Sequence, residues 1–343
     1  MLTERQLLIL QVIIDDFIQS AQPIGSRAIA KRDDVKYSSA TIRNEMADLE
    51  DLGFLEKTHS SSGRIPSERG YRFYVDHLMS PFSLANKDIR RIQTMFGEQL
   101  MEFERVVNKS AQILSDLTNY TSIILGPEVF ETELKQLQIL PLNKHSAVAI
   151  LVTNTGHVEH RSFTIPVELD PSEIEKTVRI LNEKLQGVPI YKLNQKIESE
   201  VVTLLRKHTN NFKNTYDYIQ AALFSEQPAK LYVSGRTNIM NQPEFKDIDK
   251  VRDLFSAIEE EREIAPLLRS QNHGVNVVIG HENELEAMKD CSLITASYTL
   301  GDEHMGTIAL LGPTRMDYSK VVSLLNVLSG QMSKTFRAWY QNF

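Results

Sequence analysis

The sequence has little of what secreted and membrane proteins rely on. It contains one cysteine, Cys291, among 343 residues, and one thiol cannot form a disulfide within the chain. No basic and apolar leader opens the sequence, and no apolar run approaches the roughly eighteen residues that a membrane-spanning helix requires. We therefore expect a protein of the reducing cytoplasm with no attachment to a membrane.

A surplus of positive charge is also missing. Lysine and arginine number 38, while aspartate and glutamate number 45, which gives a net charge of −7. This balance disfavours a protein that coats nucleic acid without selectivity, and equally a polybasic protein of membrane surfaces. A hydrophobic content of 41% supports sizeable cores, and the length suits roughly two or three domains.

The familiar motifs of catalysis and metal binding are absent as well. The chain has no glycine-rich phosphate loop, no His-Glu-x-x-His helix and no nucleophile elbow. His157 and His160 flank Glu159, but the alternation of a strand would send the two histidines to opposite faces. The polar residues 301–306 fit a hairpin loop, and Cys291 fits a core thiol. We expect no catalytic residue, no cofactor and no metal site.

The residues that follow Ser38 have the pattern of a helix that reads DNA. A hydroxyl at Ser38 or Ser39 can accept the free N–H groups of the first turn, and Gly53 favours an end to the helix. Its apolar residues recur at spacings of four and three, which puts them on one inward face. These residues are Ile42, Met46 and Leu49.

The outward face of this helix suits the major groove of DNA. It carries Ala40, Arg43, Asn44 and Ala47. The alanines allow the helix backbone to approach a surface closely, while arginine and asparagine supply bidentate groups for guanine and adenine edges. The acidic residues gather at the C-terminal end. A helix-turn-helix has the same polarity, since the N-terminal half of its recognition helix contacts DNA.

The preceding sequence completes a helix-turn-helix. Residues 3–20 carry the wide apolar stripe of a supporting helix. Ser26 can cap a short helix that runs to about Arg32, and residues 33–37 then form the turn into the recognition helix. The pattern predicts three helices and a turn.

A hairpin wing is predicted directly after the recognition helix. Residues 54–59 read as a strand, 60–63 as a loop and 64–66 as the returning strand. The hydrogen-bond donors of the wing are Lys57, His59 and Arg64. Arg64 follows the flexible Gly63 and is suited to a narrow minor groove, where the negative potential is strongest.

The charge of residues 1–79, the predicted DNA-binding domain, is unusual for a nucleic-acid binder. These residues include ten basic and twelve acidic side chains, a net charge of −2, although residues 57–72 on the wing side carry a net +3. Such a domain makes few phosphate contacts, so two copies must bind together for useful affinity. A winged helix that serves as a protein–protein adaptor remains an alternative.

The rest of the chain reads as one domain inserted within another. A long amphipathic helix is predicted at 85–119, with a helix at 317–340 as its packing partner, after a hinge at 80–83. The predicted strands of the surrounding domain are 121–126, 134–140, 146–153, 157–165, 275–280, 293–300 and 307–311. A mainly helical pattern interrupts them. We predict an α+β protein with a domain in two parts, 80–166 and 246–343, and an insertion at 167–245.

Five short motifs are characteristic in combination. They are LTERQ at 2–6, PIGSR at 23–27, SSATIRNEM at 38–46, SSSGRIPS at 60–67 and GYRFYVD at 70–76. With these motifs and its overall length, the chain resembles the HrcA family of bacterial heat-inducible transcription repressors. Each motif alone is weak, but the set is highly specific.

The resemblance implies a fold, a function and partners. The family joins a winged helix-turn-helix to a GAF-like α/β domain that carries an inserted, mainly helical dimerisation domain. Its homodimers repress chaperone operons by binding double-stranded DNA at an inverted-repeat operator called CIRCE, and the GroEL chaperonin helps to keep the repressor active. DNA contacts are carried over to the matching positions Ser39, Ala40, Thr41, Arg43, Asn44, Lys57, His59, Gly63 and Arg64.

Other functions stay open from the sequence. The hypotheses are a stress-response repressor, a winged-helix adaptor between proteins, a ligand-sensing regulator, and a hydrolase or other enzyme. An enzyme would require an acid, base or metal constellation that forms only in the folded core. We expect the repressor to release its operator when heat reduces the population of folded dimer.

Overall fold

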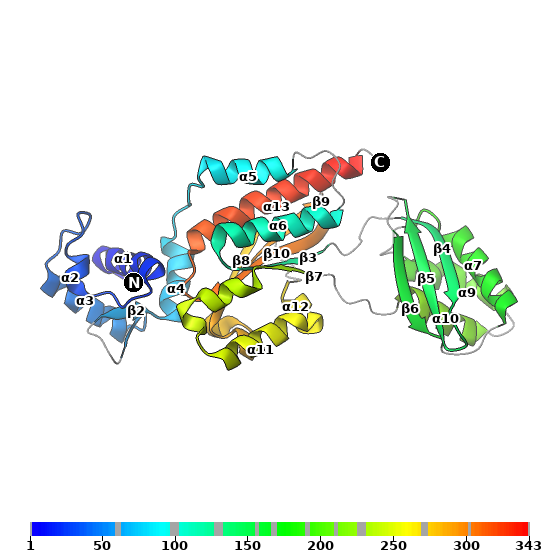
Figure 1. The fold of residues 1–343 in the computed structure, drawn as a ribbon, viewed down its shortest axis with the longest axis horizontal. Helices are drawn as coiled ribbons and strands as arrows, with labels where there is room; N and C mark the ends of the chain where they lie inside the picture. Colours follow the sequence, from blue (N-terminus) through cyan, green and yellow to red (C-terminus); the bar gives the residue numbers. More distant parts are fainter. Residues whose placement is uncertain are drawn as a thin grey trace. The chain divides into compact units, whose positions relative to one another are not determined.

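The computed structural model describes residues 2–58, 63–96, 103–126, 133–154, 158–165, 170–188, 193–208, 212–224, 231–268, 274–300 and 303–341. These residues form a mixed α and β structure that divides into two compact units (Figure 1). The first unit comprises the described residues up to 126 and from 231 to 341, and the second comprises those from 133 to 224.

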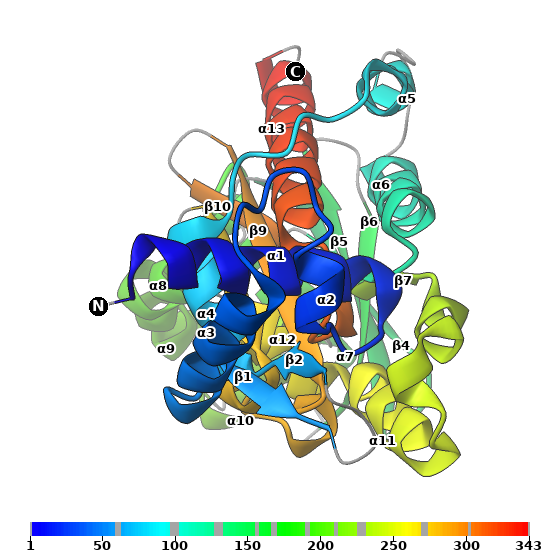
Figure 2. The same ribbon diagram turned by 90° about the vertical axis from the view of Figure 1, so that its left-hand side faces the viewer.

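The N-terminal segment, residues 2–78, is part of the first unit. Its elements are α1 (Glu4–Ser20), α2 (Ser26–Ile29), α3 (Ser39–Asp51), β1 (Leu55–Lys57), β2 (Arg64–Pro66), α4 (Glu68–Phe73) and the π-helical η1 (Tyr74–Leu78). Thr3 begins α1 with a reciprocal cap, because its hydroxyl accepts the N–H of Gln6 at 3.2 Å while the Gln6 side chain accepts the N–H of Thr3 at 3.0 Å. α1 packs against both α2 and α3 (Figure 2).

The apolar faces of α1 and α3 make the core of this segment. Both helices place large aliphatic residues at helical spacing, and these are almost completely buried. They include Ile9, Leu10, Ile13, Ile14, Ile42, Met46 and Leu49. Burial of each such side chain stabilises the fold by roughly 1.5–3 kcal/mol.

A sheet of antiparallel strands, here called the central sheet, forms the middle of the first unit. Its strands lie in the order β7 (Leu231–Ser234), β3 (Thr121–Leu125), β10 (Glu303–Pro313), β9 (Cys291–Leu300) and β8 (Val275–Ile279). Ile123 on β3 is paired with both Val233 and Ala309, and Leu125 is paired with Leu231.

Helices cover both faces of the central sheet (Figure 1). One face carries α5 (Asn86–Phe96), α6 (Phe103–Thr118) and α13 (Tyr318–Gln341), and the other carries α11 (Ile248–Glu259) and α12 (Glu261–Leu268). Short 3₁₀ turns connect the elements: η4 (Arg236–Asn241), η5 (Pro243–Phe245), η6 (Gly280–Glu282) and η7 (Glu286–Met288). The predicted packing of the C-terminal helix against the helical region before β3 is confirmed, since α13 contacts α5 and α6.

The second unit has its own sheet, here called the inserted sheet. Its antiparallel strands are β4 (Leu134–Pro141), β5 (Ser146–Thr153) and β6 (Val158–Thr164), in that order. The helical elements of the unit are α7 (Pro171–Leu185), α8 (Leu193–Lys196), the π-helical η3 (Ile197–Val201), α9 (Val202–His208) and α10 (Phe212–Phe224). They share a core with the inward residues Ala147, Ala149 and Leu151 of β5.

The structure corrects the predicted place of the middle strands. The strands at 134–140, 146–153 and 157–165 were expected to continue the sheet of 121–126, but they form the inserted sheet instead. Conversely, β7 joins the central sheet although it was assigned to the insertion. The inserted unit therefore differs from the predicted range of 167–245. Alternation of apolar residues marks a strand with one buried face, but it does not identify the neighbouring strand.

The predicted single helix at 85–119 was also wrong. Arg91 on α5 and Asp116 on α6 form an ion pair, with 2.6 Å between Nη2 and Oδ2. In a continuous helix these residues would stand roughly 37 Å apart at the usual rise per residue. α5 and α6 therefore fold back on one another. Residues 248–268 contain two further helices, α11 and α12, which belong to the first unit.

Within the described ranges, no helix combines the length and the apolar character that crossing a membrane requires.

Candidate DNA-binding surface

The predicted recognition helix is α3, and its N-terminus is fixed by a serine cap. Ser38 has an extended backbone, and its Oγ accepts the N–H of Thr41 at 3.1 Å. The two hydroxyls of Ser38 and Thr41 also lie 2.9 Å apart. The C-terminal end turns at Gly53, whose φ of +78° suits a residue without a side chain. Both ends of α3 are thus held by local chemistry.

The division of α3 into two faces agrees with the predicted pattern. Ile42, Met46 and Leu49 are buried. On the opposite side Ala40, Arg43 and Asn44 are exposed, and Ala47 is half-buried. The helix therefore presents two small side chains together with an arginine and an asparagine on one outward surface.

Ser39 and Thr41 lie beside this surface but are already engaged. The Ser39 hydroxyl lies 3.0 Å from that of Ser26, which is buried at the start of α2. The Thr41 hydroxyl lies against Ser38. Both residues are half-buried. Their contacts hold α2 and the first turn of α3 together, so any contact with DNA would come second to that packing role.

The hairpin of β1 and β2 is tied to the loop before α2. Lys57 is paired with Arg64 across the hairpin, and Ile24 exchanges two backbone hydrogen bonds of 2.9 Å with Arg64. Lys57 is exposed. His59 lies outside the described residues. The hairpin is therefore anchored by backbone bonds on two sides of β2.

Gly63 has a packing role that its sequence position did not reveal. It is buried, and a Cβ at this position would lie 2.9 Å from the backbone carbonyl of Pro23. The interpretation of Gly63 as a flexible residue beside Arg64 is therefore wrong for the folded hairpin. The glycine allows the close approach of two backbones.

Arg64 forms an ion pair with α3. Its Nε and Nη2 lie 2.7 Å and 2.6 Å from Oε2 of Glu50, and its side chain is 15% exposed. This pair joins the hairpin to the C-terminal half of the recognition helix. Insertion of Arg64 into a minor groove stays a prediction, and it requires the guanidinium to leave Glu50.

Two contacts that were not predicted tie α1 to α3 and to η1. Arg5 on α1 pairs with Glu45 on α3 at 2.7 Å. Asp15 on α1 accepts a hydrogen bond from Tyr74 at 2.9 Å, and burial raises the pKa of the Asp15 carboxyl although that bond lowers it. These long-range pairs have no periodic signature in the sequence.

Additional exposed cations lie near the start of α3. Arg27 is exposed on α2, which packs against α3, and Lys36 is exposed just before the Ser38 cap. Helix-turn-helix proteins use this region for phosphate contacts. In the sequence, Lys36 lies two residues before the Ser38 cap and Arg27 directly follows Ser26, and these positions were the available signals.

The comparisons with known proteins cover almost the whole chain. The family model described as the HrcA protein C-terminal domain matches residues 104–322. A heat-inducible transcription repressor HrcA from Oceanobacillus iheyensis is 58% identical over 341 residues, which is 99% of this chain and 99% of the relative. This chain belongs to the HrcA family.

The fold has a match among solved structures. A crystal structure described as a hypothetical protein at 2.2 Å resolution has a TM-score of 0.67 and 22% sequence identity, covering 98% of this chain and 99% of the other. The match supports the mixed α and β arrangement of this HrcA-family chain. The identity of the Oceanobacillus relative extends over the N-terminal segment, which the family model does not include.

Proposed function

We propose that this HrcA-family chain is a negative regulator of heat-shock operon transcription that binds the CIRCE inverted-repeat operator as a homodimer. The outward face of α3 carries this proposal. Ala40, Arg43 and Asn44 are exposed together on a helix whose opposite face is buried and whose ends are capped. Such a helix can enter a major groove without losing its packing.

In this proposal the N-terminal segment is a winged helix-turn-helix. α2 and α3 form the helix-turn-helix, and β1 with β2 forms the wing. Arg43 and Asn44 read base edges, Ala40 allows close approach, and Lys57 contacts the phosphate backbone. Ser39, Thr41, Gly63 and Arg64 position these groups through the contacts described above. The central sheet with its helices is the GAF-like domain of the family.

The need for a dimer follows from charge. The N-terminal segment has few exposed cations and a net negative charge, so one copy gains little affinity from phosphate contacts. Two copies joined by a stable interface bind the second operator arm at a high effective concentration. A twofold-symmetric dimer also matches the symmetry of an inverted repeat.

The inserted unit offers a surface for that dimer. The outward residues of β5 are Val148, Ile150 and Val152, all half-exposed. Leu140 on β4 is paired with Val148 and is 50% exposed, and Val158 on β6 is paired with Val152 and is 54% exposed. Gln138 and His160 are exposed on the same face on either side of Ile150. This largely apolar face, here called the apolar face, is suited to a second copy of the chain, which the inverted repeat requires.

Heat would act on this assembly through the folded population. The apparent affinity for the operator falls in proportion to the fraction of chains that remain folded and paired. A chaperonin of the GroEL type that refolds the chain would restore that fraction. Repression would then report the spare capacity for protein folding, and stress would relieve it.

The decisive experiment is a mobility shift with Arg43→Ala. We expect the parent to bind CIRCE-type DNA selectively, and the variant to lose about 1–3 kcal/mol of that binding, because a bidentate base contact is removed. Arg252→Ala on the exposed surface of α11 is the matched control. An equal loss on a random duplex would contradict base reading by Arg43.

The alternative roles predict other results in the same experiment. A protein–protein adaptor would show no sequence-dependent retardation by the parent at moderate salt. A ligand-sensing regulator would bind its operator but release it on addition of a small molecule at constant temperature. The first result would rule out an operator-binding repressor, and the second would show that release of the operator does not require a loss of folded chains.

A further inference from the structure

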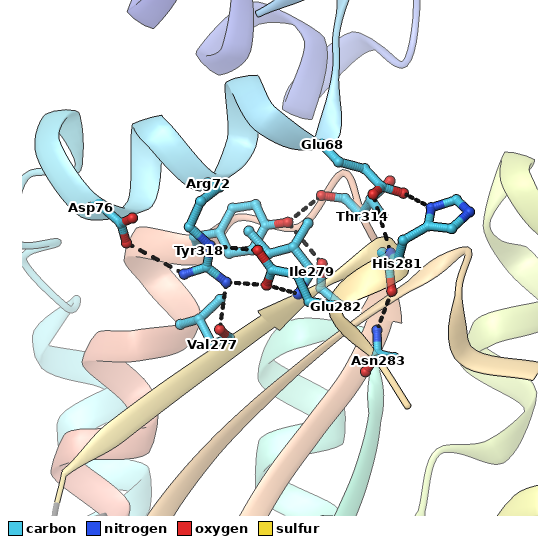
Figure 3. A network of polar contacts seen from close by, with 12 residues as sticks. Glu68, Arg72, Asp76, Val277, Ile279, His281, Glu282, Asn283, Thr314 and Tyr318 are labelled. Atoms are coloured by element: carbon cyan, nitrogen blue, oxygen red, sulfur yellow. Dashed lines mark hydrogen bonds and ion pairs between the residues drawn. The ribbon is translucent and has the colours of Figure 1, made fainter. Parts of the chain in front are cut away.

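A polar network joins α4 to the end of the edge strand β8 (Figure 3). The Arg72 Nε donates to Oε1 of Glu282 at 2.8 Å, and its Nη2 donates to the carbonyl oxygen of Val277 at 2.6 Å. Nη2 also pairs with Oε2 of Glu282, so the guanidinium holds the carboxylate at both oxygens. Bidentate pairs of this kind fix the orientation of both partners.

A second pair runs in the opposite sense beside the first. Glu68, one turn before Arg72 on α4, accepts the backbone N–H of His281 at 3.1 Å, and its Oε1 lies 2.8 Å from His281 Nδ1. Gly280 makes room for this carboxylate, because a Cβ there would lie 2.1 Å from Glu68 Oε1. α4 thus contributes the carboxylate of Glu68 and the guanidinium of Arg72. The loop after β8 contributes their partners, the imidazole of His281 and the carboxylate of Glu282.

The loop after β8 holds Glu282 in the orientation that binds Arg72. Glu282 accepts the N–H of Ile279 at 2.8 Å, which holds its carboxylate in place. Burial works against ionisation of Glu282, yet the bonds from Arg72 and Ile279 outweigh it and lower the pKa of the carboxyl. Glu282 is therefore ionised at neutral pH and ready to hold the guanidinium.

α4 is also bonded to the end of the recognition helix. The Ser67 hydroxyl caps α4 and donates to the carbonyl oxygen of Gly53 at 2.7 Å. Arg69 donates to the carbonyl oxygen of Leu52 at 2.9 Å. A continuous set of hydrogen bonds therefore runs from the C-terminal end of α3, through α4, to the edge of the central sheet.

A second attachment lies at the end of α1. Arg315, just before α13, donates to the carbonyl oxygen of Ile18 at 2.6 Å and pairs with Glu244 at 2.7 Å, and its side chain is 11% exposed. One attachment would leave the N-terminal segment free to rotate about it. Two attachments at different helices define its orientation on the central sheet.

Ion pairs that are partly exposed add little to stability, so this pair serves to orient the N-terminal segment. The Arg72 and Glu282 side chains are 30% and 41% exposed. The N-terminal segment is held to the central sheet and its helices by apolar contacts instead. One is the contact between the rings of Tyr71 and Tyr318, whose centroids lie 5.8 Å apart.

We propose that Arg72 and Glu282 are positioning residues that set the orientation of α3 on the central sheet, which is one determinant of the operator spacing that the dimer accepts. The inference rests on the proposed function. Neither residue belongs to the outward face of α3. Loss of the pair leaves each reading surface intact but lets the two copies in a dimer take a range of separations.

The experiment compares the parent chain with Glu282→Gln, which keeps the side-chain length and an oxygen acceptor for Ile279. Binding is measured by fluorescence anisotropy on three DNA types: a single operator arm, the full inverted repeat, and repeats with shortened or lengthened spacers. We expect unchanged single-arm affinity, a loss of roughly tenfold on the full repeat, and a flatter dependence on spacer length. Asp116→Asn, which removes the pair with Arg91, is the matched control.

Arg72→Gln and the double variant test whether the two residues act as one unit. We expect the double variant to lose no more than either single variant. A parent-like ratio of full-repeat to single-arm binding and a parent-like spacer preference in both single variants would overturn the inference. Failure of the parent to bind any inverted repeat would instead overturn the proposed function.

A measurement without DNA tests the orientation of the N-terminal segment separately from operator binding. Spin labels at Asp51→Cys and Arg252→Cys report the position of the N-terminal segment on the central sheet, in dimers diluted with unlabelled chain. Cys291 does not interfere, since it is buried and burial raises its pKa to about 12. Glu282→Gln should broaden the distance distribution. A distribution as narrow as that of the parent would contradict the positioning role, whether or not DNA binds.

Discussion

At the scale of single residues, Gly63 determines how the hairpin meets the loop before α2. We expect Gly63→Ala to destabilise the N-terminal segment by roughly 1–3 kcal/mol, because the added methyl group meets backbone atoms of Pro23 that cannot rotate away. Thermal unfolding followed by circular dichroism measures the change.

Gly330→Ala is the control for this substitution. Gly330 lies in α13, is exposed and has nothing within 4 Å of its Cβ position. Alanine there should stabilise the helix by roughly 0.5–1 kcal/mol. A neutral Gly63→Ala would show that the hairpin accommodates the methyl group by moving as a whole.

The sequence predicted some single residues well and others poorly. The inward and outward sides of α3 follow from helical spacing, so Arg43 and Asn44 were placed on the exposed side from the sequence alone. The pairing of Arg64 with Glu50 was not predicted, because it depends on how the hairpin folds back onto the helix. The spacing of residues along one helix does not predict a contact with another element.

At the scale of elements, the serine cap should keep the first turn of α3 helical, and so should hold the exposed residues Ala40, Arg43 and Asn44 in place. Ser38→Ala removes the hydrogen bond to the N–H of Thr41. We expect a loss of about 1 kcal/mol in the stability of this helix, within the range for serine caps. Hydrogen exchange of the first-turn amides is the most direct measurement, since it reports on α3 rather than on the whole chain.

Ser199→Ala provides the comparison for the cap. Ser199 is exposed within a helix, and its hydroxyl donates to the carbonyl oxygen of Lys196. Its removal should leave the exchange of α3 unchanged. Equal protection of the α3 amides in Ser38→Ala and the parent would show that contacts of Ser26 and Ser39 hold the first turn without the cap.

Element boundaries were predictable where the pattern is local, but their partners were not. β5 was predicted with the bounds that the structure gives, because its unbroken apolar run, residues 147–152, is bounded by Ser146 and Thr153. Its membership of a separate sheet depends on pairing with β4 and β6, which the apolar run does not specify. Similarly, the apolar stripe of α5 and α6 reads as one helix, although the two segments fold back on one another.

At the scale of the whole molecule, the apolar face of the inserted sheet should control dimerisation. We expect Ile150→Lys to shift the chain from dimer to monomer, because a charge would have to be buried at the interface. Sedimentation equilibrium measures the assembly, and circular dichroism checks the fold. Affinity for the inverted repeat should fall while affinity for a single arm is retained.

Ile248→Lys makes the same substitution outside the inserted unit. Ile248 begins α11 and is 80% exposed, so the change should leave the dimer intact. A dimer of unchanged stability in both Ile150→Lys and Leu140→Lys would exclude this face as the site of association.

The pairing of Leu125 with Leu231 has a consequence for how this architecture could arise. The chain leaves the central sheet and returns to it at directly opposed positions on neighbouring strands, roughly 5 Å apart in an antiparallel ladder. In topological terms, the hundred or so residues between them occupy the tip of a β-hairpin. A short tight turn could replace them without disturbing the register of the sheet. An ancestral hairpin could thus have gained or lost this module by one insertion or deletion in its turn.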